Sequence, residues 1–130
     1  MSADRLFLLV GALLGALGVV AGAIGAHALR TLLAPEKLAL FETAVRYQMY
    51  HAVALCVLGL VIGRFEGRAV PWAGALLVLG TLLFSGSLYV YVMTGVRFAA
   101  SITPFGGASL IAGWACLAWA ALTSPRRSAH

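Results

Sequence analysis

Charged side chains are scarce in this sequence of 130 residues. Four residues are acidic and nine are basic, so charged residues make up 10% of the chain, against 62% that are hydrophobic. A soluble globular domain carries about 25% charged residues. This deficit excludes an ordinary soluble domain and predicts an integral membrane protein of a single domain.

The few charges are also absent from long stretches of the chain. Residues 6–29, 70–95 and 98–124 contain no Asp, Glu, Lys or Arg. Each stretch exceeds the ~20 apolar residues that cross a bilayer as a helix. With a fourth apolar segment they predict four transmembrane helices. The predicted spans are residues 6–29, 47–63, 71–93 and 104–123, with an interfacial helical segment at residues 35–46 before the second span.

Proline is rare as well, with four residues in the chain. It is favoured in the first turn of a helix and disfavoured in the interior. We therefore expect Pro104 to open the fourth helix, with Thr103 as its N-cap. We expect the second and third helices to begin at Pro35 and Pro71 and to end at Gly63 and Gly95. Pro125 follows the predicted end of the fourth helix. This pattern predicts an all-α, up-down bundle of four helices.

The distribution of Lys and Arg predicts the orientation of the bundle. With both termini on one side, that side carries five basic residues (Arg5, Arg64, Arg68, Arg126 and Arg127). The opposite side carries four (Arg30, Lys37, Arg46 and Arg97). The positive-inside rule then predicts that both termini are cytoplasmic. Because the basic residues are spread over loops and ends, we expect no nucleic-acid partner.

Five glycines form a regular stripe in the first span. Gly11, Gly15, Gly18, Gly22 and Gly25 are spaced by four, three, four and three residues. This spacing places them on one helix face, where glycine lets another helix approach closely. The stripe predicts helix packing, either within the chain or between copies in a homo-oligomer.

The N-terminal segment also resembles a secretory signal. Arg5 precedes an apolar run, and the small residues Ala26 and Ala28 imitate a cleavage site. The apolar run continues to Ile24, which is longer than a usual signal core. We therefore expect a transmembrane helix here.

The longest polar-bearing stretch is residues 35–51. It contains two of the four acids, one of the three histidines and two of the four tyrosines. Glu42 precedes Arg46 by four residues, the favourable order for an ion pair on a helix. In a four-span topology this stretch and its polar neighbours gather at the outer interface. We expect this polar outer rim to bind a ligand or partner through His27, Glu42, Arg46, Tyr47, His51, Ser85, Ser87 and Tyr89.

The rim residues permit several interpretations. They can be polar residues that only stabilise a helix where it enters the membrane, or they can form a functional site. His27 and His51 are expected at similar depth, a geometry that suits a metal or haem, but no further matched ligands accompany them. Cys56 and Cys116 fit no metal motif. We therefore expect no metal, no cofactor and no catalytic residues.

Four motifs resemble those of one known family. They are GAIGAHALR at residues 22–30, FETAVRYQMYHA at residues 41–52, FSGSLYVYVMTG at residues 84–95 and SITPFGGASLIAGW at residues 101–114. The chain resembles the small bacterial membrane proteins grouped as domain of unknown function 423, which are related to eukaryotic transmembrane protein 256. The resemblance implies a four-helix protein of the bacterial inner membrane and supplies no catalytic residues.

The expected function is therefore structural or accessory rather than enzymatic. The rim would bind a lipid, a small molecule or another membrane protein. The alternative is a small transporter or channel for a small molecule, lipid or ion, acting as an oligomer. Transporters usually place ionisable groups along the route, and no span carries a charge near its middle.

Overall fold

The computed structural model describes residues 1–125 and confirms the all-α prediction. It contains four long helices: α1 (Ala3–Ile24), α2 (Pro35–Val61), α3 (Ala69–Thr94) and α4 (Arg97–Thr123). A π-helical turn, η1 (Gly25–Leu29), extends α1, and a 3-10 turn, η2 (Ile62–Arg64), follows α2. All four helices are long and apolar enough to cross a membrane.

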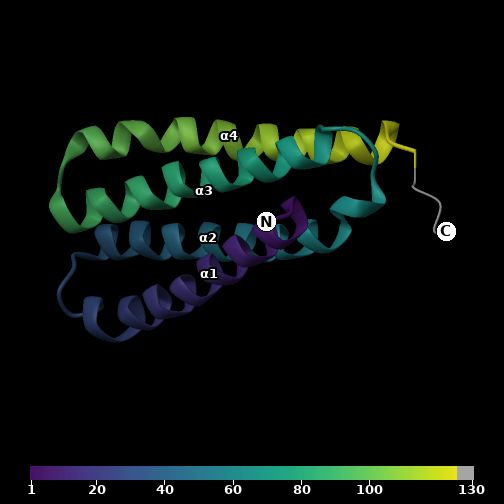
Figure 1. Cartoon of the computed structure of the whole chain (residues 1–130). Coiled ribbons are helices and arrows are strands. Elements are labelled where there is room, and N and C mark those ends of the chain that lie inside the picture. Colours follow the sequence, from purple (N-terminus) through teal and green to yellow (C-terminus); the bar gives the residue numbers. More distant parts are fainter. Residues whose placement is uncertain (126–130) are drawn as a thin grey trace.

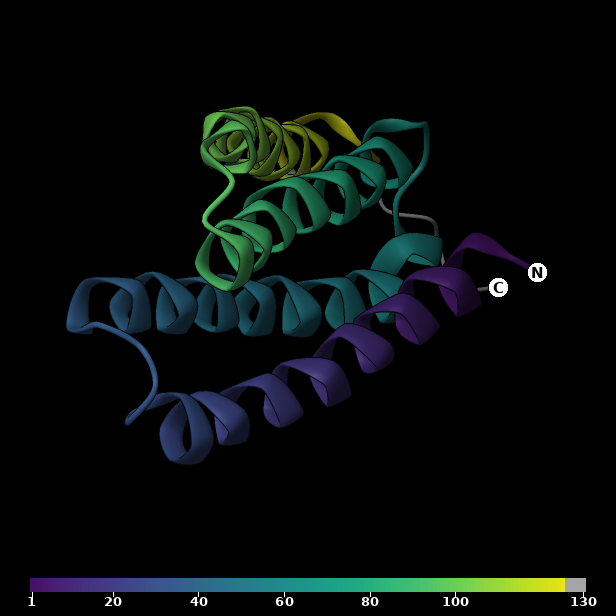
Figure 2. The ribbon, with the colours of Figure 1, turned by 90° about the vertical axis from the view of Figure 1, so that its left-hand side faces the viewer.

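The helices form two antiparallel hairpins (Figures 1 and 2). One hairpin pairs α1 with α2 and the other pairs α3 with α4, and the two hairpins meet where α2 packs on α3. α1 begins and α4 ends at the same end of the array, as an up-down order requires. α1 and α4 therefore flank a central pair, and the cytoplasmic location of both ends stays a prediction.

Glycines bring the backbones of α1 and α2 together. The α1 stripe faces α2, and a Cβ on Gly11 would lie 2.8 Å from the carbonyl oxygen of Ala52. A Cβ on Gly25 would lie 3.0 Å from the ring of Phe41, and one on Gly59 of α2 would lie 2.7 Å from the backbone oxygen of Asp4. The stripe is thus covered by α2 of the same chain.

The second hairpin uses the same device in both of its helices. A Cβ on Gly80 of α3 would lie 2.7 Å from Leu110, and one on Gly113 of α4 would lie 2.8 Å from Leu77. Gly106 faces the backbone of Phe84 even more closely. Close backbone approach stabilises helix pairs in lipid, where no hydrophobic drive exists between them.

The structure corrects the predicted start of the fourth helix. α4 begins at Arg97, and Pro104 lies inside it. Gly95 adopts a left-handed conformation (φ 73°) and ends α3, so a two-residue link is enough to start the next helix. Thr103 is not an N-cap; its hydroxyl lies 2.7 Å from that of Ser87 on α3. Proline costs α4 one backbone bond, which does not end the helix here.

The second helix is longer than its predicted span. α2 runs without a break from Pro35 to Val61, so the expected interfacial segment and the span form one helix. Its first turns pack beside α1, as the contact between Phe41 and Gly25 shows. Pro35 lies in the first turn, as predicted.

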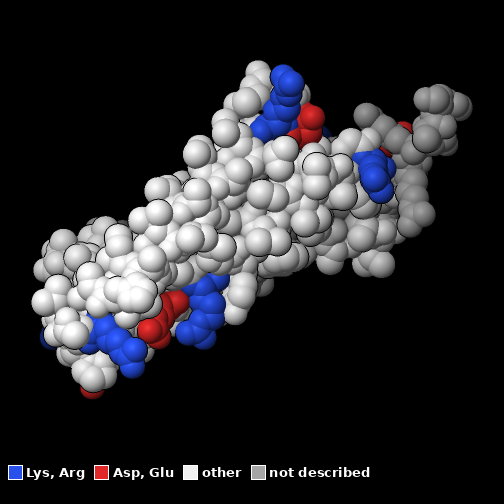
Figure 3. Space-filling view, turned by 90° about the horizontal axis from the view of Figure 1, so that it is seen from below, with Lys and Arg blue, Asp and Glu red and all other residues white. Residues whose placement is uncertain are grey.

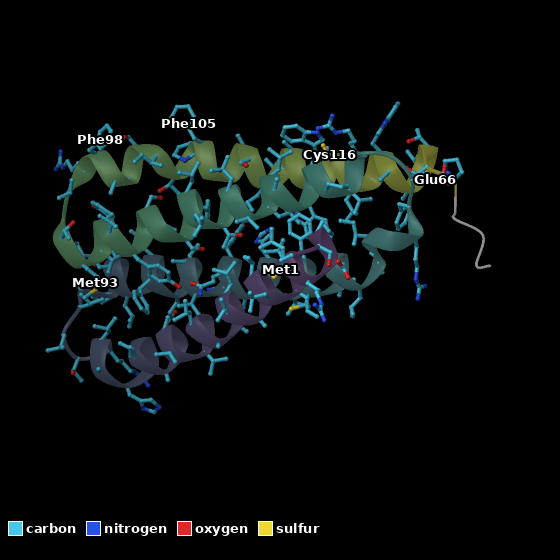
Figure 4. The ribbon with its side chains drawn as sticks, viewed as in Figure 1. Met1, Glu66, Met93, Phe98, Phe105 and Cys116 are labelled. Atoms are coloured by element: carbon cyan, nitrogen blue, oxygen red, sulfur yellow. The ribbon has the colours of Figure 1, made fainter. Side chains whose placement is uncertain are left out.

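The outer surfaces of the flanking helices are apolar. Leu17 and Val19 on α1 are 61% and 63% exposed, and Phe105 and Ile111 on α4 are 71% and 73% exposed. Phe98 and Phe105 project outward from α4 (Figure 4). On the face shown in Figure 3 the charges lie toward the two ends, and the surface between them is uncharged. This surface suits contact with lipid chains.

Substituting Gly106 with Ala is expected to destabilise the protein by about 1–3 kcal/mol, because the added methyl overpacks the backbone of Phe84. Gly86→Ala is the matched control, since a Cβ there meets nothing within 4 Å. The control should be neutral or stabilising by up to about 1 kcal/mol, because alanine favours a helix. Thermal unfolding in detergent measures both variants; equal melting temperatures would contradict the close approach of α3 and α4.

Candidate functional site

Gln48 joins three helices from the buried face of α2. Its side-chain nitrogen donates to the carbonyl oxygen of Leu14 on α1 at 2.8 Å. Its side-chain oxygen accepts from the hydroxyl of Tyr89 on α3 at 2.7 Å. Gly18 of α1 lies beside these bonds and leaves room for the side chain of Met49, whose sulfur a Cβ there would overlap. Both polar atoms of the Gln48 side chain are therefore engaged in bonds that hold the two hairpins together.

Two serines among the predicted rim residues also bond between helices. Ser85 of α3 donates to the carbonyl oxygen of Ala44 on α2 at 2.7 Å. Ser87 contacts the Thr103 hydroxyl of α4 and donates to the carbonyl oxygen of Phe84. Within the described residues, every buried side-chain nitrogen and oxygen has a hydrogen-bond partner. These groups stabilise the array and present no unpaired atom to a ligand.

His51 is buried, and both of its ring nitrogens are engaged. The indole nitrogen of Trp114 on α4 donates to Nε2 at 3.1 Å, and Nδ1 lies 2.6 Å from the carbonyl oxygen of Tyr47. Because an indole N–H can only donate, Nε2 carries no proton. Nδ1–H then donates to Tyr47, and the ring is neutral. His51 has no nitrogen left for a metal or a haem.

His27 does not approach His51, which corrects the expectation of similar depth. His27 is exposed in η1, next to the contact between Gly25 and Phe41. Ten residues separate Phe41 from His51, which is about 15 Å along a helix. The expectation took His51 as the beginning of the helix that follows His27, whereas α2 begins at Pro35, 16 residues earlier. No group of three metal-ligating side chains occurs in residues 1–125.

Glu42 and Arg46 lie beside a groove between α1 and α2, called here the α1–α2 groove. Both side chains are exposed. The groove has a volume of about 290 Å³, and the two helices line it with Gly22, Gly25, Ala26, Phe41, Glu42, Val45, Arg46, Met49 and Tyr50. Apart from Glu42 and Arg46, its walls are apolar or aromatic. One acidic and one basic side chain thus border a groove that suits a hydrocarbon chain.

A larger groove is lined by α2, α3 and α4 and is called here the aromatic groove. Its volume is about 490 Å³, and its lining residues are Tyr47, Tyr50, His51, Phe84, Gly107, Leu110, Ile111 and Trp114. The rings of Tyr47 and Phe84 have centroids 4.5 Å apart, and those of His51 and Trp114 are 6.0 Å apart. No Asp, Glu, Lys or Arg lines this groove.

The predicted rim therefore divides into separate parts. Ser85, Ser87 and Tyr89 bond between helices, Glu42 and Arg46 border the α1–α2 groove, and Tyr47 and His51 line the aromatic groove. Sequence reasoning missed two residues, Gln48 and Trp114, as members of the site. A lone amide in the middle of an apolar helix was the available signal for Gln48, since such a group needs a partner. No local signal connected Trp114 with His51.

Comparison with known proteins identifies relatives over most of the chain. The model of the family described as "Protein of unknown function (DUF423)" matches residues 21–107. The UPF0382 membrane protein of Staphylococcus haemolyticus is 44% identical over 113 residues, which cover 87% of this chain and 92% of that protein. The UPF0382 inner membrane protein YgdD of Escherichia coli K12 is 35% identical over 124 residues, which cover 95% of each chain. No solved structure matches the chain.

Gln48→Met and Tyr89→Phe are each expected to destabilise the protein, because each removes a bond between helices. The losses of unfolding free energy should not add: a double-mutant cycle should give a coupling of about 0.6 kcal/mol, the average for such bonds in membranes. Unfolding by SDS titration measures the four proteins of the cycle. Thr43→Val is the control, since the Thr43 hydroxyl bonds only within α2. Additive effects of the two substitutions would contradict the Gln48–Tyr89 bond.

Proposed function

The chain belongs to the DUF423 family and is a multi-pass protein of the bacterial inner membrane. From this premise we propose that it binds a membrane phospholipid as a non-catalytic accessory protein. The proposed site is the α1–α2 groove. The observation that supports it is the position of Glu42 and Arg46 at the border of an apolar groove on a lipid-facing surface.

The depth of Arg46 favours a phosphate ligand. Arg46 lies 11 residues after Pro35, so its Cα is about 17 Å along α2 from the start of the helix. A guanidinium at this position must reach toward the polar surface or meet an anion. Guanidinium groups bind phosphate with paired hydrogen bonds. A phospholipid head offers that anion at the depth where the side chain is exposed.

Glu42 selects among phospholipid heads. It precedes Arg46 by one helical turn and borders the same groove. A carboxylate repels a head that carries only negative charge, and it attracts an ammonium group. We therefore propose a zwitterionic head of the phosphoethanolamine class, with its phosphate at Arg46 and its ammonium at Glu42.

The walls of the groove suit an acyl chain. Gly22 and Gly25 leave the α1 side of the groove without bulky side chains, and Val45 and Met49 supply apolar surface from α2. Methionine adapts its shape to irregular apolar partners. The charged border and the apolar walls together match the two parts of a phospholipid.

A binding role accounts for the interior of the array better than transport does. The buried polar side chains of residues 1–125 are bonded to one another or to backbone groups. A transport route needs polar groups that can exchange partners with a passing substrate. The transport alternative predicts a flux in proteoliposomes that changes in Glu42→Gln or His51→Ala, and such a result would replace the binding proposal.

Arg46→Gln is expected to lower retention of phosphatidylethanolamine about tenfold, because a charge-assisted pair contributes about 1.5 kcal/mol or more. Native mass spectrometry of the protein in detergent, with equal amounts of phosphatidylethanolamine and phosphatidylglycerol added, measures bound lipid. Arg97→Gln is the control, since Arg97 begins α4 and does not line the groove. Glu42→Gln should shift the preference toward phosphatidylglycerol. Equal lipid retention in the Arg46 and Arg97 variants would contradict the proposal.

A further inference from the structure

The aromatic groove is independent of the phospholipid site, although Tyr50 borders both grooves. We propose that the aromatic groove binds an isoprenoid quinone, with the quinone ring against the aromatic side chains and the prenyl tail directed into the surrounding lipid. Three properties of the groove support this ligand class: its aromatic walls, its lack of charge, and the two tyrosines among its lining residues.

The walls present several rings to a planar ligand. Tyr47 lies 4.5 Å from Phe84 and 6.2 Å from His51, measured between ring centroids, with interplanar angles of 31° and 28°. Trp114 continues the series from α4 at 6.0 Å from His51. Aromatic side chains stack on flat ligand rings and contribute more than their buried area alone. A volume of about 490 Å³ lies within the usual range of ligand sites, about 300–1,000 Å³.

The absence of charge distinguishes this groove from the α1–α2 groove. No acidic or basic residue lines it, whereas Glu42 and Arg46 border the other groove. A phosphate or ammonium head placed here would lose its hydration without a counter-ion, which is costly in a membrane. A lipid with an uncharged ring carries no such cost.

The hydroxyls of Tyr47 and Tyr50 supply hydrogen-bond donors. None of the side-chain hydrogen bonds among residues 1–125 uses either hydroxyl. A quinone carbonyl accepts such a bond without any change of charge. His51 does not serve as the donor, because its Nδ1–H is bonded to Tyr47 and its Nε2 accepts from Trp114. The bonded His51 instead holds the wall of the groove in place.

The shape of the groove orients the ligand. Tyr47 lies one turn before His51 on α2, and on α4 the groove runs from Gly107 to Trp114, which bonds His51. From Gly107 to Trp114 the groove follows α4 for seven residues, or about 10 Å. The ring is placed at the tyrosines, which supply the donors, and the tail follows the α4 side, where Ile111 is 73% exposed.

Fluorescence of Trp114 tests this assignment. The chain has three tryptophans, so Trp72→Phe with Trp119→Phe leaves Trp114 as the only indole. The protein is placed in liposomes of phosphatidylcholine and titrated with a ubiquinone that has two isoprene units. Because quinones quench indole fluorescence at contact, we expect saturable quenching. Native mass spectrometry of the wild-type chain with the same quinone should show a one-to-one complex.

Two substitutions and their controls locate the site. Gly107→Leu should abolish saturable quenching, because its Cβ lies 3.8 Å from the Phe84 ring and the larger side chain fills the groove. Gly86→Leu is its control, since Gly86 lines the separate groove between α1 and α3. Tyr47→Phe should raise the apparent Kd about fivefold through loss of one hydrogen bond. Arg46→Gln should leave quinone binding unchanged, which separates this proposal from phospholipid binding.

Three results would overturn the proposal. Quenching that rises linearly with quinone in wild type and in Gly107→Leu alike would show only dissolution of quinone in the bilayer. Equal competition by squalene, a prenyl hydrocarbon without a ring, would show a groove for tails alone. Failure of the wild-type chain to form the one-to-one complex would exclude a quinone site.

Discussion

The structure depends on the cost of an unpaired polar group in a membrane. α2 carries a glutamine and a histidine on faces that water cannot reach, and both side chains find partners on other helices. Gln48 binds α1 and α3, and His51 accepts a bond from α4. α2 is therefore in polar contact with every other helix, although α1 and α4 lie on opposite sides of the array. Each of these bonds constrains which helices are neighbours and at what depth.

Glycines allow the helices to approach closely enough for these hydrogen bonds between helices. The stripe on α1 brings the backbone close enough for Gln48 to reach Leu14, and glycines of α3 and α4 set a similar distance in the second hairpin. The α1–α2 groove lies within the first hairpin, and the aromatic groove lies between the two hairpins. The α1–α2 groove has charged groups at its border and the aromatic groove has none. Two chemically different surfaces toward the lipid thus follow from the packing of one central helix.

The predicted fold and the predicted site differ in how well they agree with the structure. Charge-free runs and boundary residues such as Pro35 and Gly95 identified the helices, because length and hydrophobicity are local properties. Pro104 was misread, because a short link after Gly95 lets α4 start seven residues earlier and tolerate the missing backbone bond. The predicted rim residues do not share one location. His27 lies about 15 Å from the level of His51, and Ser85 and Ser87 serve packing.

The sequence alone determined that this chain is a four-helix membrane protein of a recognisable family. It did so because a bilayer requires long apolar helices, and these are visible in composition and spacing. Only the tertiary structure decided which polar residues are satisfied internally and which border a groove. That distinction depends on the rotation and depth of each helix against its neighbours, and contacts such as His51 with Trp114 join residues 63 positions apart. No periodicity within one helix contains that information.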